Sequence, residues 1–330
     1  MVCILNFSYI YTLSSVRPIT TIMIDTAFLS HPFTEKHDMG EGHPESPART
    51  MAIARHFANI GLDHKMLQLQ PDMAYEEAVL RVHHPRYIEQ LEQMSPLAGL
   101  IQADPDTLMG PFSHDAAYYA AGAGIMAVDD IVAGKYQRAF CSVRPPGHHA
   151  EPNSTMGFCF INNIAVAVQQ LRSIYDIKRV AIIDFDVHQG NGTVEIFKNI
   201  PDVLFCSSFQ HPFYPNSHWN IDRPNIVNSP IPAFSTGEQL MQIWENQWLP
   251  ALIKHRPEFI FISAGFDAHR DDPMAEMNWL ANDYYWITAR LCEIANQYSS
   301  GRIVSMLEGG YNLKALAACA EQHVRALLEI

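Results

Sequence analysis

Short apolar runs that alternate with longer helical patterns constrain the fold of this 330-residue chain more than any other feature. Five runs are rich in Val, Ile and Phe and are apolar on both faces: residues 138–143, 179–183, 203–207, 259–263 and 302–307. Such runs are typical of strands buried within a parallel sheet. Helical patterns occur at residues 115–133, 163–174, 237–254 and 283–297. The alternation predicts one α/β domain with a mainly parallel sheet.

Polar motifs follow four of the five runs directly. They read Arg-Pro-Pro-Gly-His-His at 144–149, Asp-Phe-Asp-Val-His at 184–188, Ala-Gly-Phe-Asp at 264–267 and Glu-Gly-Gly-Tyr at 308–311. The carboxyl ends of parallel strands share one edge of a sheet, and ligand sites form at that edge. The sequence therefore predicts that four motifs far apart in the chain meet in one active site.

A metal site is the first chemistry that these motifs suggest. Asp184, Asp186 and His188 are alternate residues, which share a face if the segment is extended. Asp267 would add a carboxylate from another strand. Two carboxylates and one imidazole suit zinc or ferrous iron and leave a coordination position open for water or substrate. A calcium loop also begins Asp-x-Asp, but it needs glycine at its sixth position, where this chain has Gln189.

Proton transfer is the second chemistry. His148 and His149 follow a stiff Pro-Pro-Gly turn, and imidazole titrates in the range that suits proton transfer near neutral pH. Asp184 and Asn191 are candidate partners for the two rings, and a carboxylate and an amide would make the pair electrostatically unequal. Tyr311 follows two glycines, and its hydroxyl can donate to an oxygen that becomes negative in a tetrahedral transition state.

Composition indicates which classes of binding partner and which cellular compartment are compatible with this chain. Lys and Arg number 22 against 35 Asp and Glu, a formal charge of −13, which disfavours direct nucleic-acid binding. Six widely spaced cysteines without a Cys-x-x-Cys pair indicate free thiols in a reducing compartment. Residues 1–22 fit neither a signal peptide nor a membrane span, so we expect a leader of undefined role, a catalytic domain at 23–330 with an alternative start at Met23, no membrane association and a cytoplasmic location.

The motifs as a set resemble those of the histone deacetylase family over nearly the whole chain after about Phe28. The segments that carry the resemblance are residues 43–47 with Arg49, 82–88, 144–149, 157–163, 184–193, 263–267 and 307–311. Each segment alone is a modest signal, whereas all of them in this order are specific. Asn191 matches the class II and bacterial pattern, in contrast to the Asp of class I members.

The resemblance implies the arginase/deacetylase fold, with helices on both faces of the parallel sheet, and a zinc-dependent amidohydrolase that releases acetate from acetyl-lysine-type substrates. The roles it implies are zinc binding for Asp186, His188 and Asp267, tandem histidines for His148 and His149, carbonyl polarisation for Tyr311, channel lining for Gly157, Phe158 and Tyr214, and structural potassium binding for Asp184 and Ser207. Zinc would polarise the acetamide carbonyl. A histidine takes a proton and a histidine returns it to the amine, and the sequence leaves open which ring does each.

Departures from the family pattern leave the substrate open. Gln189 stands where many relatives have a second His, and residues 210–216 differ from the usual rim loop. Members specialised for acetylated polyamines carry an acidic gatekeeper after an Asp-Pro pair, where this chain has the apolar Met274. This favours an acetylated lysine peptide or protein over a small acetylated amine. The oligomeric state, including a homo-oligomer, stays open.

Two other functions compete with this interpretation. A ureohydrolase with two manganese ions needs an Asp-x-His-x-Asp run, and Gly190 stands at the second Asp. A non-catalytic module that binds acetylated amines would be expected to lose the histidine pair or Tyr311, and both are present.

Overall fold

The computed structural model describes residues 25–330, so the predicted leader and the alternative start at Met23 lie outside the described residues. Within them, eight parallel strands form one sheet in the order β2-β1-β5-β10-β9-β6-β7-β8. The strands are β1 (Thr26–Leu29), β2 (Leu67–Leu69), β5 (Arg138–Cys141), β6 (Val180–Asp184), β7 (Val203–Gln210), β8 (Ile226–Ile231), β9 (Phe259–Ala264) and β10 (Ile303–Leu307). The predicted α/β class with a mainly parallel sheet is confirmed.

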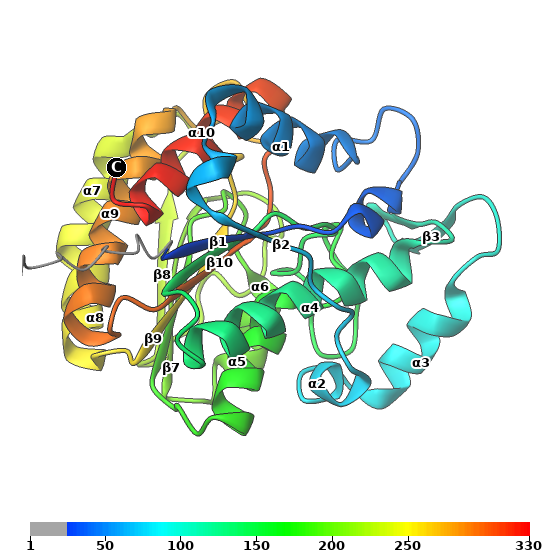
Figure 1. Ribbon diagram of the computed structural model, residues 1–330, viewed down its shortest axis with the longest axis horizontal. Coiled ribbons are helices and arrows are strands. Elements are labelled where there is room, and N and C mark those ends of the chain that lie inside the picture. The colour runs from blue at the N-terminus through cyan, green and yellow to red at the C-terminus, as the bar shows by residue number, and fades with distance from the viewer. Residues whose placement is uncertain (1–24) are drawn as a thin grey trace, which may run out of the picture.

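Helices cover both faces of the sheet. They are α1 (Ala48–Ile60), α2 (Glu76–Leu80), α3 (Pro85–Met94), α4 (Ser113–Val132), α5 (Asn163–Ile174), α6 (Asn191–Phe197), α7 (Gly237–Ile243), α8 (Leu249–His255), α9 (Ala281–Tyr298) and α10 (Leu313–Leu327). Figure 1 shows α1 and α10 above strand β1, and α4 and α5 below it. Apolar side chains form one buried cluster on each face, and the two clusters are the core.

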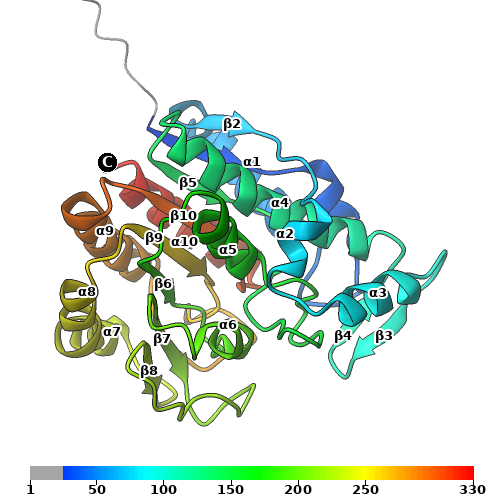
Figure 2. The ribbon, with the colours of Figure 1, turned by 90° about the horizontal axis from the view of Figure 1, so that it is seen from below.

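A small antiparallel hairpin lies outside the main sheet. Its strands are β3 (Ile101–Asp104) and β4 (Thr107–Met109). The hairpin and α3 group together at one end of the molecule (Figure 2). The turn between β3 and β4 carries Asp106, which reappears in the active-site pocket described below.

The predicted elements agree closely with the observed ones where the pattern is strong. The helix predicted at 163–174 matches α5 at both ends, and the one predicted at 237–254 is a continuous run of α7, a π-helical turn at Trp244–Trp248 and α8. The edge strand β8 was not predicted, because its polar residues and Pro230 break the apolar pattern. The described cysteines, 141, 159, 206, 292 and 319, are all buried and free, as predicted.

A core histidine makes the fold sensitive to acid. His323 is fully buried against Phe140, Phe185 and Phe266, and its ring nitrogens contact the hydroxyls of Thr288 and Ser305 at 2.7 and 2.8 Å. Burial lowers the pKa of His323 to about 3. An unfolded histidine titrates near about 6.5, so the unfolded state takes up the proton first as the pH falls. The stabilisation is therefore complete above about pH 6.5 and is lost progressively below it.

We expect His323 to account for a loss of about 2 kcal/mol in the free energy of unfolding between pH 7 and pH 5. Urea denaturation at both pH values measures the loss. His323→Gln is the matched variant, because its amide can bond both hydroxyls but does not titrate. The pH dependence of the variant should be shallower by that amount, and an unchanged slope would contradict the assignment.

Candidate active site

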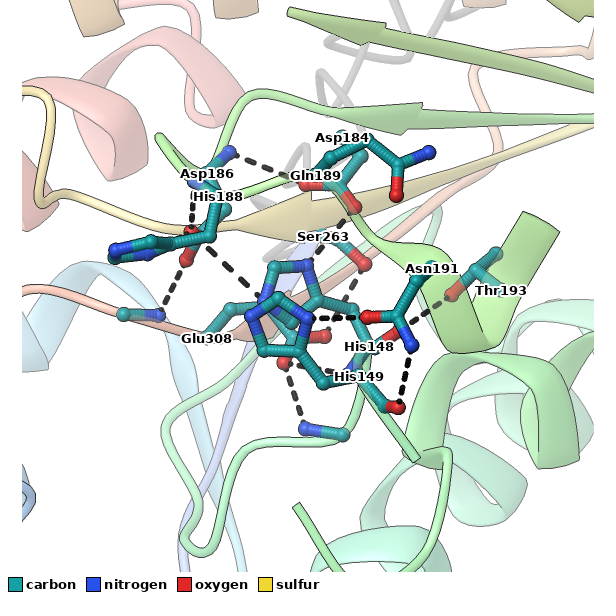
Figure 3. Close-up of polar contacts among 12 residues, drawn as sticks. His148, His149, Asp184, Asp186, His188, Gln189, Asn191, Thr193, Ser263 and Glu308 are labelled. Atoms are coloured by element: carbon teal, nitrogen blue, oxygen red, sulfur yellow. Dashed lines mark hydrogen bonds and ion pairs between the residues drawn. The ribbon is translucent and has the colours of Figure 1, made fainter. Parts of the chain in front are cut away.

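The four polar motifs meet at the carboxyl edge of the sheet, where β5, β10, β9 and β6 are neighbours. Figure 3 shows side chains from three of the motifs, at 144–149, 184–188 and 308–311, gathered in one network. Two glycines permit the close approach. A Cβ at Gly265 would lie 2.0 Å from Asp186 Oδ2, and one at Gly309 would lie 2.0 Å from Asp267 Oδ2. The backbone therefore packs directly against the two carboxylates, which no larger residue would allow.

Asp186, His188 and Asp267 form a buried group whose ligand atoms all lie within 4.8 Å of one another. His188 Nδ1 lies 3.1 Å from Asp186 Oδ1 and 3.2 Å from Asp267 Oδ2. Asp267 Oδ2 is buried without a hydrogen bond. A buried carboxylate oxygen is costly unless a cation or a donor satisfies it. Two carboxylates and an imidazole at this spacing fit a divalent zinc or iron ion.

The backbone around these ligands departs from the extended segment that the sequence suggested. Strand β6 ends at Asp184, and the chain bends through the residues that follow. Asp186 Oδ1 accepts a hydrogen bond from the backbone N–H of His188 at 2.9 Å, which brings the two ligands together. Asp184 is outside the ligand group and faces His148 instead. The prediction that Asp184, Asp186 and His188 share one face assumed an extended segment, and the segment is extended only as far as Asp184.

Each tandem histidine has its own partner, as expected. His148 Nδ1 lies 3.0 Å from Asp184 Oδ2, and His149 Nδ1 lies 2.7 Å from Asn191 Oδ1 (Figure 3). Both rings and both partners are buried. The pair is unequal because one partner is a carboxylate and the other is a neutral amide.

The surroundings shift the pKa values of the two imidazoles in opposite directions. Burial opposes protonation of His148, but the carboxylates around it, Asp184 foremost, outweigh burial and hold its pKa well above the usual value. Burial, together with the neighbouring rings of His148 and His188, holds the pKa of His149 well below the usual value. At neutral pH the site therefore has a protonated His148 beside a neutral His149 that can accept a proton.

Glu308 anchors the turn that carries the histidines. Its Oε2 accepts hydrogen bonds from the backbone N–H groups of Gly147 at 2.7 Å and His148 at 3.1 Å, and Ser263 Oγ donates to Oε1 at 3.1 Å. Burial raises the pKa of this carboxyl group to about 7. The sequence motif contained Glu308, but nothing local to it showed that it would hold a turn 160 residues away.

A buried ion cluster lies at the start of the same turn. Arg144 donates to both carboxylate oxygens of Glu45 at 2.6 Å, and Arg49 donates to Oε1 at 3.1 Å. All three side chains are fully buried. Although burial opposes ionisation, Arg144 foremost, and then His37 and Arg49, hold the pKa of Glu45 well below its ordinary value. Glu45 is therefore the counter-charge of two arginines.

Glu45→Gln is expected to lower the free energy of unfolding by about 3–5 kcal/mol, because it leaves buried guanidinium groups uncompensated. Urea denaturation followed by circular dichroism measures this change. Glu41→Gln, on the exposed part of the same loop, is the control and should unfold like the wild type. Equal stability of Glu45→Gln and the wild type would show that the cluster needs no counter-charge.

A pocket of about 190 Å³ leads to the histidines and the ligand group. Its lining residues are Asp106, His149, Gly157, Phe158, His188, Phe213, Tyr214, Met274 and Tyr311. The predicted channel residues Gly157, Phe158, Tyr214 and Met274 all line it. Asp106 and Phe213 also line the pocket, and neither was predicted from the sequence. Asp106 lies in an Asp-Pro-Asp turn, a sequence that is common in surface turns and does not indicate a pocket residue.

Tyr311 lies in the wall of this pocket. Its ring packs edge-on against Phe158, with centroids 6.0 Å apart, and the Arg49 guanidinium lies 4.9 Å from the ring centroid. Burial raises the pKa of Tyr311 well above its usual value. The phenol therefore keeps its proton at neutral pH and is available as a hydrogen-bond donor.

Asp184 and Ser207, the predicted potassium ligands, are paired residues of β6 and β7. Ser207 Oγ is buried and has no hydrogen-bond partner. Gln189 does not belong to the ligand group: its amide donates to Asn228 Oδ1 at 3.3 Å, and its oxygen is also unpaired. The unpaired oxygens leave room in the hydrogen-bond network for a cation or water.

No helix in residues 25–330 is long and apolar enough to cross a membrane.

The chain is similar in sequence and in structure to known deacetylases. Residues 43–327 match the family model described as "Histone deacetylase domain". A "Histone deacetylase-like amidohydrolase" of Pseudomonas aeruginosa is 35% identical, over 84% of this chain and 75% of the relative. A "Probable deacetylase" of Archaeoglobus fulgidus is 34% identical, over 88% and 82%. The crystal structure of the HDA15 HD domain superposes with a TM-score of 0.87 at 32% identity, covering 92% of this chain and 88% of that one.

Proposed function

Because the chain belongs to the histone deacetylase family and is a hydrolase of amide bonds, we propose that it is a zinc-dependent deacetylase of acetyl-lysine side chains. Its products would be acetate and the free amine, and residues 23–330 would form the catalytic domain. The observation that carries the proposal is the buried group of Asp186, His188 and Asp267, of which His188 lines the same pocket as His149 and Tyr311.

Asp186, His188 and Asp267 would hold the zinc ion, and ferrous iron is the alternative that the same ligands accept. When bound, zinc would polarise the acetamide carbonyl as a Lewis acid. Elemental analysis of protein purified without added metal distinguishes the two metals.

The residues around the pocket supply the proton transfers. We assign to His149 the removal of the proton from the attacking water, because its partner Asn191 is neutral and leaves the ring uncharged. His148, paired with Asp184, contributes positive charge beside the reaction. The Tyr311 hydroxyl donates to the oxygen that becomes negative when water adds to the carbonyl. The proton held by His149 then passes to the amine nitrogen as the C–N bond breaks.

The pocket supports an aliphatic acylated amine as substrate. Phe158, Tyr214 and Met274 give it apolar walls, which suit the methylene chain of acetyl-lysine in a peptide or protein. Asp106 favours the second candidate, a small acetylated polyamine, because its carboxylate can pair with a further ammonium group.

Asp184 and Ser207, with backbone carbonyls, would bind a structural potassium ion. The unpaired buried hydroxyl of Ser207 supports this assignment. Thermal unfolding in potassium buffer and in tetramethylammonium buffer, whose cation is too large for such a site, tests it. A melting temperature that does not depend on the cation would contradict it.

The experiment that tests the proposed function measures acetate release from an acetyl-lysine peptide and from acetylated spermidine and putrescine. Each assay is run with the untreated enzyme, after chelation and after zinc is added back. We expect release that chelation stops and zinc restores, with the peptide as the faster substrate. Faster release from the polyamines would favour the second candidate. No acetate from any substrate, in protein that holds one zinc ion, would refute the proposed deacetylase activity.

A further inference from the structure

We propose that Glu151 is a positioning residue that sets the tautomer of His149 by orienting the side-chain amide of Asn191. The inference rests on the proposed function only for its effect on catalysis. Glu151 follows His149 by two residues, and its side chain is 28% exposed, whereas Asn191 is fully buried as the first residue of α6.

The orientation of the Asn191 amide follows from its neighbours. Its nitrogen, Nδ2, donates to Glu151 Oε1 at 2.8 Å and lies 3.3 Å from both the backbone oxygen of His149 and Met156 Sδ. A carboxylate, a carbonyl and a thioether have no hydrogen to donate, so only the NH₂ end of the amide can face them. The oxygen of the amide is therefore turned toward His149 Nδ1, at 2.7 Å.

This orientation determines which nitrogen of His149 carries the proton. Asn191 Oδ1 only accepts hydrogen bonds, so Nδ1 of the neutral ring must be the protonated nitrogen. The lone pair then lies on Nε2, which is free to accept a proton. The opposite amide orientation would offer an N–H to Nδ1 and favour a ring protonated at Nε2, which cannot act as a base there.

Among the three acceptors around Asn191 Nδ2, Glu151 has the largest influence. It is the only charged one and makes the shortest contact, and charge-assisted hydrogen bonds are about twice as strong as neutral ones. Turning the amide over would place Oδ1 against the Glu151 carboxylate. His148 needs no residue to orient its partner, because either carboxylate oxygen of Asp184 can accept a hydrogen bond from the ring.

The turn that carries Glu151 is packed firmly against α6. Glu151 and Ser154 form a short bridge, and a Cβ at Gly192 would lie only 2.2 Å from the backbone oxygen of Ala150. On its outer side Glu151 faces His218, whose Nδ1 lies 4.0 Å from Oε1. Glu151 is therefore held between the catalytic pair and the surface by backbone contacts that do not depend on its charge.

The first test compares Glu151→Ala with Glu151→Gln. The alanine variant should lose about tenfold in kcat, the low end for a residue that orients a catalytic group. KM should stay within about twofold, because no substrate contact is removed. Glu151→Gln should keep most of the activity, since its amide oxygen can still accept from Asn191. Glu195→Ala, a carboxylate on α6 that does not bond Asn191, is the control and should behave like the wild type.

A second background separates positioning from structural damage. An aspartate at position 191 has two acceptor oxygens and needs no orientation, so Glu151→Ala should have no harmful effect in the Asn191→Asp background. A tenfold loss in both backgrounds would overturn the proposal, and so would a wild-type rate for Glu151→Ala or an equal loss in Glu151→Gln.

The tautomer can also be read without turnover, from the nitrogen chemical shifts of ¹⁵N-histidine-labelled protein, with His149→Gln to assign the signal. Wild type should show His149 protonated at Nδ1, and Glu151→Ala should show a mixture of tautomers. An unchanged Nδ1–H signal in Glu151→Ala would refute the inference whether or not the enzyme deacetylates. Absence of acetate release from the wild type would refute only the proposed function.

Discussion

Asp267→Asn is expected to lose its zinc and to lower deacetylation by at least about 10³-fold, because zinc supplies several kcal/mol of transition-state stabilisation. The replacement keeps the shape of the residue, and its amide oxygen can still accept from the backbone N–H of Val187, as Oδ1 does at 2.9 Å. It removes only the negative charge that would balance the proposed zinc ion. Elemental analysis and acetate release from an acetyl-lysine peptide measure the two losses.

Asp271→Asn is the matched control for this variant. Asp271 lies on the same loop and is exposed, and its carboxylate forms ion pairs with the neighbouring His269 and Arg270. It should retain one zinc per chain and the wild-type rate. If Asp267→Asn kept its zinc and its activity, the assignment of Asp267 as a metal ligand would be wrong.

Tyr311→Phe should lower kcat by about 10²–10³-fold, the usual loss when one donor to a developing oxyanion is removed. Zinc content and KM should change little, because the phenyl ring keeps its contacts with Phe158 and the Arg49 guanidinium. Steady-state kinetics with the acetyl-lysine peptide, at matched zinc occupancy, measures the effect.

Tyr284→Phe controls for the loss of a buried phenol. The Tyr284 hydroxyl is buried without a hydrogen-bond partner and lies in the core beside Phe185 and Phe266. Its removal should leave kcat unchanged. A zinc-loaded Tyr311→Phe with a near wild-type rate would exclude the phenol as the oxyanion donor.

The prediction of the site was most successful where a short motif follows a strand. His148, Asp186, Asp267 and Tyr311 come together because four parallel strands end at one edge. Prediction failed where the backbone changes direction after a strand. The chain bends after Asp184 instead of continuing as the extended segment that the sequence suggested, and no local pattern of apolar and polar residues encodes that bend.

Residues outside the motifs were the least predictable. Asp106 reaches the pocket from a hairpin outside the sheet, and Phe213 reaches it from the rim loop. Glu45 and Arg144 are 99 residues apart, so the ion pair between them cannot be predicted from the residues around either one. Loops of this kind are positioned by contacts with distant segments rather than by their own periodicity.

The fold class, the positions of the central strands and the set of residues gathered at their ends could be predicted from the amino-acid sequence. Those properties depend on side-chain periodicity and on the parallel direction of neighbouring strands, which are local or general. The folded chain shows which candidate partner faces which ring, Asp184 with His148 and Asn191 with His149, and it brings Glu151 to the far end of the Asn191 amide. A hydrogen bond forms or fails within a few tenths of an ångström and within a limited range of angles, and that precision arises only when distant loops pack together.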